Sequence, residues 1–129
     1  MATPLHCASR NGYVEAMKLL IAHGADIKAK NKYGRTPLHM ASEFGHIEAM
    51  KLLIDCGADV NDKDESDNTP LHSASWGNCT NAVKLLIDHG ANVNAKDMWN
   101  MTSLYKASWN GYTGVVALLR EDRKSTRLN

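Results

Sequence analysis

The side chains of this chain that could do chemistry are six histidines, three cysteines and recurring Ser and Asp residues. Imidazole and thiolate groups bind zinc when their spacing lets several of them reach one ion. Ser, His and Asp can form a catalytic triad when one set meets in a pocket. Cys7, Cys56 and Cys79 form no Cys-x-x-Cys pair, and no His is paired with Cys or another His at a ligand spacing. We therefore predict no catalytic residue, no metal site and no cofactor.

The histidines instead follow a period of 33 residues. The tetrapeptide Thr-Pro-Leu-His begins at Thr3, Thr36 and Thr69, and Thr-Ser-Leu-Tyr stands in the same phase at Thr102. The other histidines also occupy repeat positions, one in a Gly-His pair and two directly before a Gly. A fixed period of this length is the signature of a protein built from stacked repeats. Ser, His and Asp are therefore scaffold positions that recur in each copy.

Each repeat predicts two helices joined by a tight turn. In the second copy Thr36 can cap a helix with its hydroxyl group, Pro37 suits the first helical position, and Gly45 can end the helix in the left-handed conformation. Apolar residues at helical spacing follow from Ile47, and Gly57 stops the second helix. The stretches between repeats are rich in Asp, Asn and Ser, which suit turns or extended hairpins. We predict helix pairs near residues 3–22, 36–56, 69–89 and 102–120.

Two copies depart from this pattern where Gly is expected. In the third copy Asn78 and Cys79 replace the Gly-His pair. We expect Asn78 to adopt the left-handed conformation, which Asn tolerates better than most residues. In the loops before the third and fourth copies, Asp67 and Asn100 replace the Gly34 of the second. We expect those two hairpins to be less regular.

These residues resemble the ankyrin repeat, whose signature is Thr-Pro-Leu-His-x-Ala at a period of 33 residues. The resemblance covers residues 1–121 and rests on three long copies in phase. It implies an all-α ankyrin-repeat solenoid of stacked helix-turn-helix units with hairpin loops. The signature His is expected to bond between repeats through both ring nitrogens. About four repeats result, with the terminal ones incomplete, at 1–33, 34–66, 67–99 and 100–121.

Both ends of the chain predict a fragment. Leu5, Met17 and Leu20 are core-type residues for which we expect no earlier repeat to provide cover. Residues 122–129 read Asp-Arg-Lys-Ser-Thr-Arg-Leu-Asn, which is the translation of GATCGGAAGAGCACACGTCTGAAC, the start of a widely used sequencing-library adapter. We expect a non-native, adapter-derived tail that adds nothing to the core. The alternative is a natural basic tail.

The composition predicts a soluble domain, with 43% hydrophobic and 22% charged residues. The net charge is +1 and stays close to zero without residues 122–129, which argues against a nucleic-acid partner. The sequence has no apolar run of membrane-spanning length and no secretory signal at its start, so no membrane association is expected. The cysteines are odd in number, so we expect free thiols in an intracellular compartment, cytoplasmic or nuclear.

The aromatic residues carry the functional prediction. Tyr33 and Trp99 stand at equivalent loop tips, while Phe44, Trp76 and Trp109 stand near the ends of the first helices of their repeats. In ankyrin repeats these two zones line the concave surface and vary with the partner, so the resemblance places five of the eight aromatic residues where a partner binds. Large exposed aromatic residues are typical anchors of protein interfaces. Each ring could instead pack against its own hairpin or the neighbouring helix.

We predict a partner-binding surface formed by Tyr33, Arg35, Phe44, Trp76, Trp99 and Trp109. The implied function is that of a monomeric protein–protein interaction module, a rigid scaffold that binds another protein through its concave face and is not an enzyme. The alternative is a targeting or substrate-recruiting fragment of a larger multidomain enzyme, which the untruncated reading frame would distinguish. Nucleic-acid binding is disfavoured by the near-neutral charge, and a steep loss of binding with salt would revive it.

Overall fold

The computed structural model describes the backbone of residues 2–128 and the side chains of residues 2–122. Within this part of the chain the regular secondary structure is entirely helical, which confirms the predicted all-α class. The helices form four units of two, and each unit contains one predicted helix pair. In chain order they are α1 (Pro4–Asn11), α2 (Val14–Ala22), α3 (Pro37–Glu43), α4 (Ile47–Asp55), α5 (Pro70–Trp76), α6 (Thr80–Asp88), α7 (Ser103–Trp109) and α8 (Thr113–Leu128).

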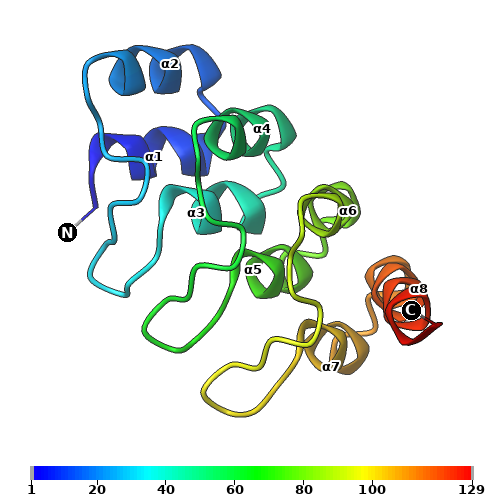
Figure 1. Ribbon diagram of the computed structural model, residues 1–129. Coiled ribbons are helices and arrows are strands. Elements are labelled where there is room, and N and C mark those ends of the chain that lie inside the picture. Colours follow the sequence, from blue (N-terminus) through cyan, green and yellow to red (C-terminus); the bar gives the residue numbers. More distant parts are fainter. Residues whose placement is uncertain (1, 129) are drawn as a thin grey trace.

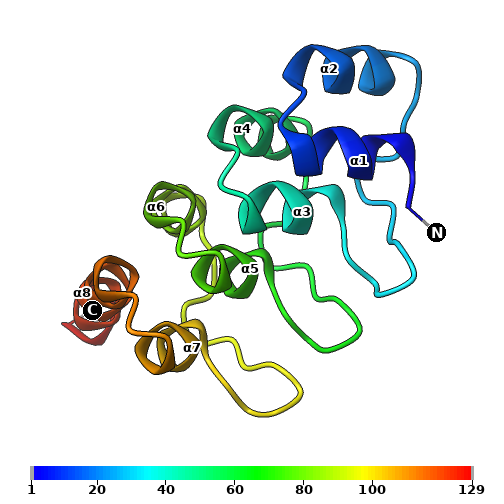
Figure 2. The same cartoon turned by 180° about the vertical axis from the view of Figure 1, so that it is seen from behind.

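The helices lie in two rows (Figures 1 and 2). One row contains α1, α3, α5 and α7, the other contains α2, α4, α6 and α8, and each helix contacts the next one in its row. The loops that join successive units all project from the same side of the stack, next to the α1 row. Stacking buries apolar faces that no unit could bury alone.

The first helix of each unit begins directly after a capping Thr, as predicted. The side chains of Thr3, Thr36 and Thr69 accept a hydrogen bond from the backbone N–H three residues later, and a Pro follows each Thr. Thr102 caps α7 in the same way, with the N–H of Tyr105 as donor. The sequence signature therefore acts first as a helix start.

A residue in the left-handed conformation follows each of the first six helices within two residues. Asn78 has φ 55°, close to the 68° of the equivalent Gly45, so its predicted role is confirmed. The second helices of the first three units end two residues before Gly24, Gly57 and Gly90, all with positive φ. The equivalent position in the fourth unit is Arg123. Because this stop signal is missing, α8 continues to Leu128, past the predicted end at residue 120.

The helical backbone thus includes most of the range predicted to be an adapter-derived tail. Side chains from residue 123 onward, and residue 129 altogether, lie outside the described residues. The expectation that residues 122–129 add nothing to the core therefore stays a prediction.

The core runs as one cluster through all four units and includes the fully buried Leu53, Leu86 and Leu119. Leu5 and Met17 are also buried, and Leu20 is half-buried. The cover of these side chains comes from within the described part of the chain. α1 packs against α3, and α2 packs against α4.

A buried imidazole joins each of the first three units to the loop that follows it. In His6, His39 and His72 the Nδ1 atom accepts a hydrogen bond from the backbone N–H of the capping Thr at 3.1 Å. Nδ1 must therefore be unprotonated, and Nε2–H donates to a backbone carbonyl 29 residues later. These distances are 2.8, 2.8 and 2.9 Å, with Arg35, Asn68 and Met101 as acceptors. Both ring nitrogens are bonded, but only the Nε2 bond joins two repeats. The Nδ1 bond stays within its own repeat, so the prediction that both nitrogens bond between repeats is wrong for Nδ1.

These imidazoles predict a loss of stability in mild acid. Burial lowers the pKa of His39 and His72 below the ordinary value. In the unfolded chain these two histidines bind protons as the pH falls below about 6.5, whereas in the folded chain they bind them only at a lower pH. The free energy of unfolding is therefore at its full value above about pH 6.5 and decreases below it. Urea unfolding between pH 7.5 and 5 should show that the free energy of unfolding decreases with falling pH, and His39→Gln should make this slope smaller. The matched control, His89→Gln, changes an exposed histidine and should keep the parent slope. A flat pH profile would contradict buried neutral imidazoles.

Gly77 marks a second close contact between units, one position before the left-handed Asn78. Its φ of −78° is open to any residue. A Cβ atom there would overlap the backbone carbonyl oxygen of Glu43. The missing side chain therefore sets how closely α5 approaches α3.

Gly77→Ala should lower the free energy of unfolding by about 1–3 kcal/mol, because the backbone of Glu43 must move to make room. The matched control is Gly114→Ala, where a Cβ atom would meet Thr80 Cγ2 at an ordinary 3.4 Å. That control should be neutral or stabilising by up to about 1 kcal/mol, as expected for Gly in a helix. Denaturant melts of both variants test this, and equal effects would show that the Glu43 carbonyl imposes no constraint.

Candidate functional site

The loops between units are three hairpins built around a recurring Asn or Asp. The side-chain Oδ1 atom of this residue accepts hydrogen bonds from the backbone N–H groups two and four residues later, at 2.8–3.0 Å. The residues are Asn31, Asp64 and Asp97. Asp67 and Asn100 adopt φ of 61° and 66°, near the 76° of Gly34, and their hairpins keep the same bonds. The expectation that these two hairpins are less regular is therefore wrong.

Successive hairpins are tied to one another. Glu65 N–H donates to Tyr33 O at 3.0 Å, and Met98 N–H donates to Ser66 O at 2.9 Å. Lys30 Nζ lies 3.3 Å from Asp62 Oδ1. The loops therefore form one continuous wall beside the α1 row.

A polar hollow of about 420 Å³ lies between this wall and the first helices of units two to four. Its lining carries charges of both signs, and Arg35 and Glu43 are paired with each other. Arg35 Nη1 lies 3.4 Å from Glu43 Oε2, and Arg35 Nη2 donates to Ser73 Oγ at 3.3 Å. Arg35 thus bridges units two and three across the floor of the hollow. The hollow is lined by Tyr33, Arg35, Glu43, Asp64, Ser66, Asn68, His72, Ser73, Trp76 and Lys106.

The second cation of the hollow is held by a buried carboxylate. Lys106 Nζ lies 3.0 Å from Asp97 Oδ2 and donates to Asn68 Oδ1 at 3.1 Å. Burial alone would raise the pKa of Asp97, but the N–H of Met101 and the ammonium of Lys106 outweigh it, so the pKa lies below its ordinary value. Asp97 stays ionised, and its charge neutralises Lys106.

An apolar hollow of about 280 Å³ adjoins the polar one, because Trp76 and Lys106 line both. Its other lining residues are Met101, Tyr105, Trp109 and Asn110. The rings of Tyr105 and Trp109 stack with centroids 6.4 Å apart and planes 12° from parallel. The apolar hollow is therefore walled largely by aromatic surface.

The predicted aromatic residues are all exposed, at 45–80% of their surface, while Leu53 and Leu86 on the second helices are buried. Tyr33, Arg35 and Trp76 line the polar hollow, and Trp76 and Trp109 line the apolar one. Phe44 and Trp99 line neither. Phe44 carries the guanidinium of Arg10 over its ring at 5.2 Å. Local packing, the alternative open from the sequence, thus accounts in part for Phe44, and membership of a binding surface stays a prediction for all six residues.

Sequence reasoning missed Tyr105, Lys106 and Asp97. The signal available was their departure from the repeat: Tyr105 stands where the earlier units have His, and Lys106 where they have Cys, Met or Ser. Tyr105 is exposed, whereas the equivalent His39 and His72 are buried. The apolar hollow exists where the fourth unit leaves the pattern.

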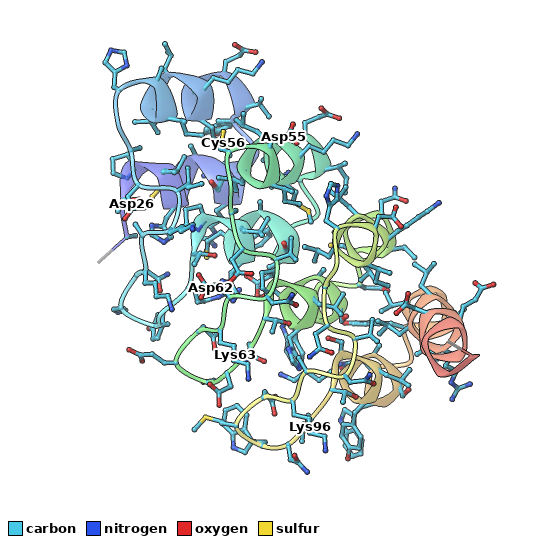
Figure 3. All side chains as sticks on the ribbon, in the orientation of Figure 1. Asp26, Asp55, Cys56, Asp62, Lys63 and Lys96 are labelled. Carbon is cyan, nitrogen blue, oxygen red and sulfur yellow. The ribbon has the colours of Figure 1, made fainter. Side chains whose placement is uncertain are left out.

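Metal and membrane sites find no support in the described part of the chain. No three His, Cys, Asp or Glu side chains described here are arranged to hold a metal ion. None of the described helices combines the length and apolarity needed to cross a bilayer. Figure 3 shows acidic and basic side chains mixed along the loops, with Asp26 between α2 and α3, Asp62 and Lys63 between α4 and α5, and Lys96 between α6 and α7.

Comparison with protein families gives two matches. Residues 1–64 match the family model described as ankyrin repeats in three copies, and residues 53–100 match the one described as ankyrin repeats in many copies. Together the two matches span residues 1–100. No curated protein matches the chain.

The ion pair between Asp97 and Lys106 can be tested by a stability measurement, because the same chain carries neutral residues at the equivalent positions of an earlier repeat. Lys106→Met should cost about 2–4 kcal/mol of unfolding free energy, because it leaves a buried carboxylate unpaired. The double variant Asp97→Asn/Lys106→Met recreates the Asn31 and Met40 found at the equivalent positions two repeats earlier. It should regain most of the loss, since an Asn side chain holds that turn equally well. Denaturant melts measure both, and a double variant no more stable than Lys106→Met would contradict the pairing.

Proposed function

The chain belongs to the ankyrin-repeat family, and we propose that it binds another protein through the groove between its hairpin wall and the α1 row. Ankyrin repeats are generally protein-interaction modules. The binding surface in this proposal consists of Tyr33, Arg35, Phe44, Trp76, Trp99 and Trp109, with Trp76 at its centre. The module acts as a monomer and supplies recognition rather than catalysis.

The observation that carries the proposal is the exposure of two tryptophans beside the adjoining hollows. Trp76 is 57% exposed and Trp109 is 80% exposed. Trp is the residue type most enriched among the side chains that dominate binding energy at protein interfaces, and such residues gain most when a partner excludes water around them. Exposed apolar area rimmed by polar groups is typical of an interaction site.

The charge of the groove supports a protein partner over a nucleic acid. Arg35 is paired with Glu43 and Lys106 with Asp97. The net charge of the chain is +1. A phosphate backbone is recognised by unpaired basic residues along one face, and the basic residues of this groove are already neutralised.

The groove is also held in shape before any partner arrives. Its wall is fixed by the Asx bonds of each hairpin and by the backbone bonds between hairpins. Its floor is fixed by the imidazole bonds from one unit to the next. Pre-organised surfaces lose little conformational entropy on binding, which leaves more of the contact energy as affinity.

Trp76→Ala should weaken binding by about 2 kcal/mol or more, as for an interface anchor, with little loss of fold stability. Leu53→Ala should do the reverse, costing about 2–5 kcal/mol of unfolding free energy through a core cavity. The measurements are the Kd for a partner purified after affinity capture and a denaturant melt of each variant.

Tyr13→Ala serves as the matched control, because Tyr13 is an aromatic residue of similar exposure at the turn between α1 and α2, outside the groove. It should leave affinity unchanged. If Trp76→Ala unfolds the protein and the remaining folded fraction binds as before, the aromatic residues are packing residues and the site is wrongly placed.

A further inference from the structure

We propose that the apolar hollow is an anchor subsite that takes one large, uncharged side chain from an extended, uncharged segment of the partner. The inference rests on the proposed function, because it concerns what the groove selects. It concerns the hollow walled by Trp76, Tyr105 and Trp109.

The size of the hollow favours a single side chain. Its volume of about 280 Å³ falls just below the range of about 300–1,000 Å³ that is usual for pockets holding whole small molecules. One large aromatic or aliphatic side chain fills such a space, and the rest of the partner must then lie outside it. The polar hollow next to it provides that place.

The walls favour an apolar side chain. The stacked rings of Tyr105 and Trp109 form one wall, and the exposed ring of Trp76 contributes another. Met101 adds a flexible apolar surface, of the kind that adapts to differently shaped ligands. A side chain buried here gains contacts with aromatic faces and edges on more than one side.

The charges argue against an ionic side chain of either sign. Among the described residues that line the apolar hollow none is acidic, so a cation that left water there would find no carboxylate to pair with. An anion would have to displace Asp97 from Lys106, or Glu43 from Arg35. An uncharged segment requires neither, so electrostatic complementarity selects it.

The polar hollow suits the backbone of such a segment. Asn68, Ser73 and Glu43 present amide, hydroxyl and carboxylate groups there, and Tyr33 stands at the hairpin side. A peptide backbone needs hydrogen-bond partners when it leaves water. Because Trp76 and Lys106 line both hollows, one continuous segment can place its backbone in the first and a side chain in the second.

The test uses a capped heptapeptide of Ser and Gly with one central residue, titrated against the ¹⁵N-labelled full chain. The indole N–H signals of the three tryptophans report where it binds, and Trp99, which lines neither hollow, is the internal control. With Trp or Leu at the centre, the signals of Trp76 and Trp109 should shift saturably while that of Trp99 stays in place. Affinity should exceed that of the Ala-centred peptide by about tenfold, since one large side chain becomes buried. Trp109→Ala should remove most of that gain, and Tyr13→Ala, which lies outside the groove, should keep it.

Peptides centred on trimethyllysine and on Glu test the charge argument. If either binds more tightly than the Trp-centred peptide, or if Trp99 shifts together with Trp76, the inference is overturned. Its failure is distinguishable from that of the proposed function. Should Trp76→Ala weaken partner binding while the Trp-centred peptide leaves Trp109 unshifted, the groove binds a partner and the anchor subsite is wrong. Should the peptide bind as expected while Trp76→Ala leaves partner binding intact, the partner uses another face.

Discussion

The hydrogen bond from a buried imidazole to a backbone carbonyl in the following hairpin is the interaction on which the rest of the structure depends. It fixes where each hairpin ends relative to the first helix of the unit before it, and it recurs at nearly the same length in the first three units. The Asx residue then shapes the hairpin, and backbone bonds join one hairpin to the next. The wall of the groove therefore follows from the position of a few buried nitrogen atoms.

The aromatic part of the groove lies where the fourth unit departs from the repeat pattern. In the fourth unit Tyr105 replaces the imidazole, its ring is exposed, and it stacks on Trp109. Lys106 of this unit and Asp97 of the hairpin before it replace the neutral Met40 and Asn31 found 66 residues earlier, and they neutralise each other. The scaffold and the candidate anchor subsite are thus divided along the chain, with regular units providing rigidity and the irregular one providing aromatic surface.

The fold could be predicted from the sequence because its signals are local. Thr36 before Pro37 starts a helix and Asn78 ends one through their own backbone and side-chain chemistry, so spacing along the chain was enough. The site could be predicted only in part. Arg35 meets Ser73 across 38 residues, and Lys106 meets Asn68 across the same separation. Such contacts depend on how closely units stack, which Gly77 helps to set, and no local pattern reports that distance. The end of α8 was missed for a simpler reason, since a stop was assumed where Arg123 replaces Gly.

The acceptors of the three imidazole bonds are the carbonyl groups of Arg35, Asn68 and Met101, three residues with unrelated side chains. Every amino acid offers the same carbonyl, so the joint between units places no demand on which residue stands there. Those side chains face the hollows, as Arg35, Asn68 and Met101 all do. Mutation can therefore alter the chemistry of the groove at these positions while the hydrogen bonds that hold the stack stay intact. Such a protein can acquire new partners through a series of variants that all still fold.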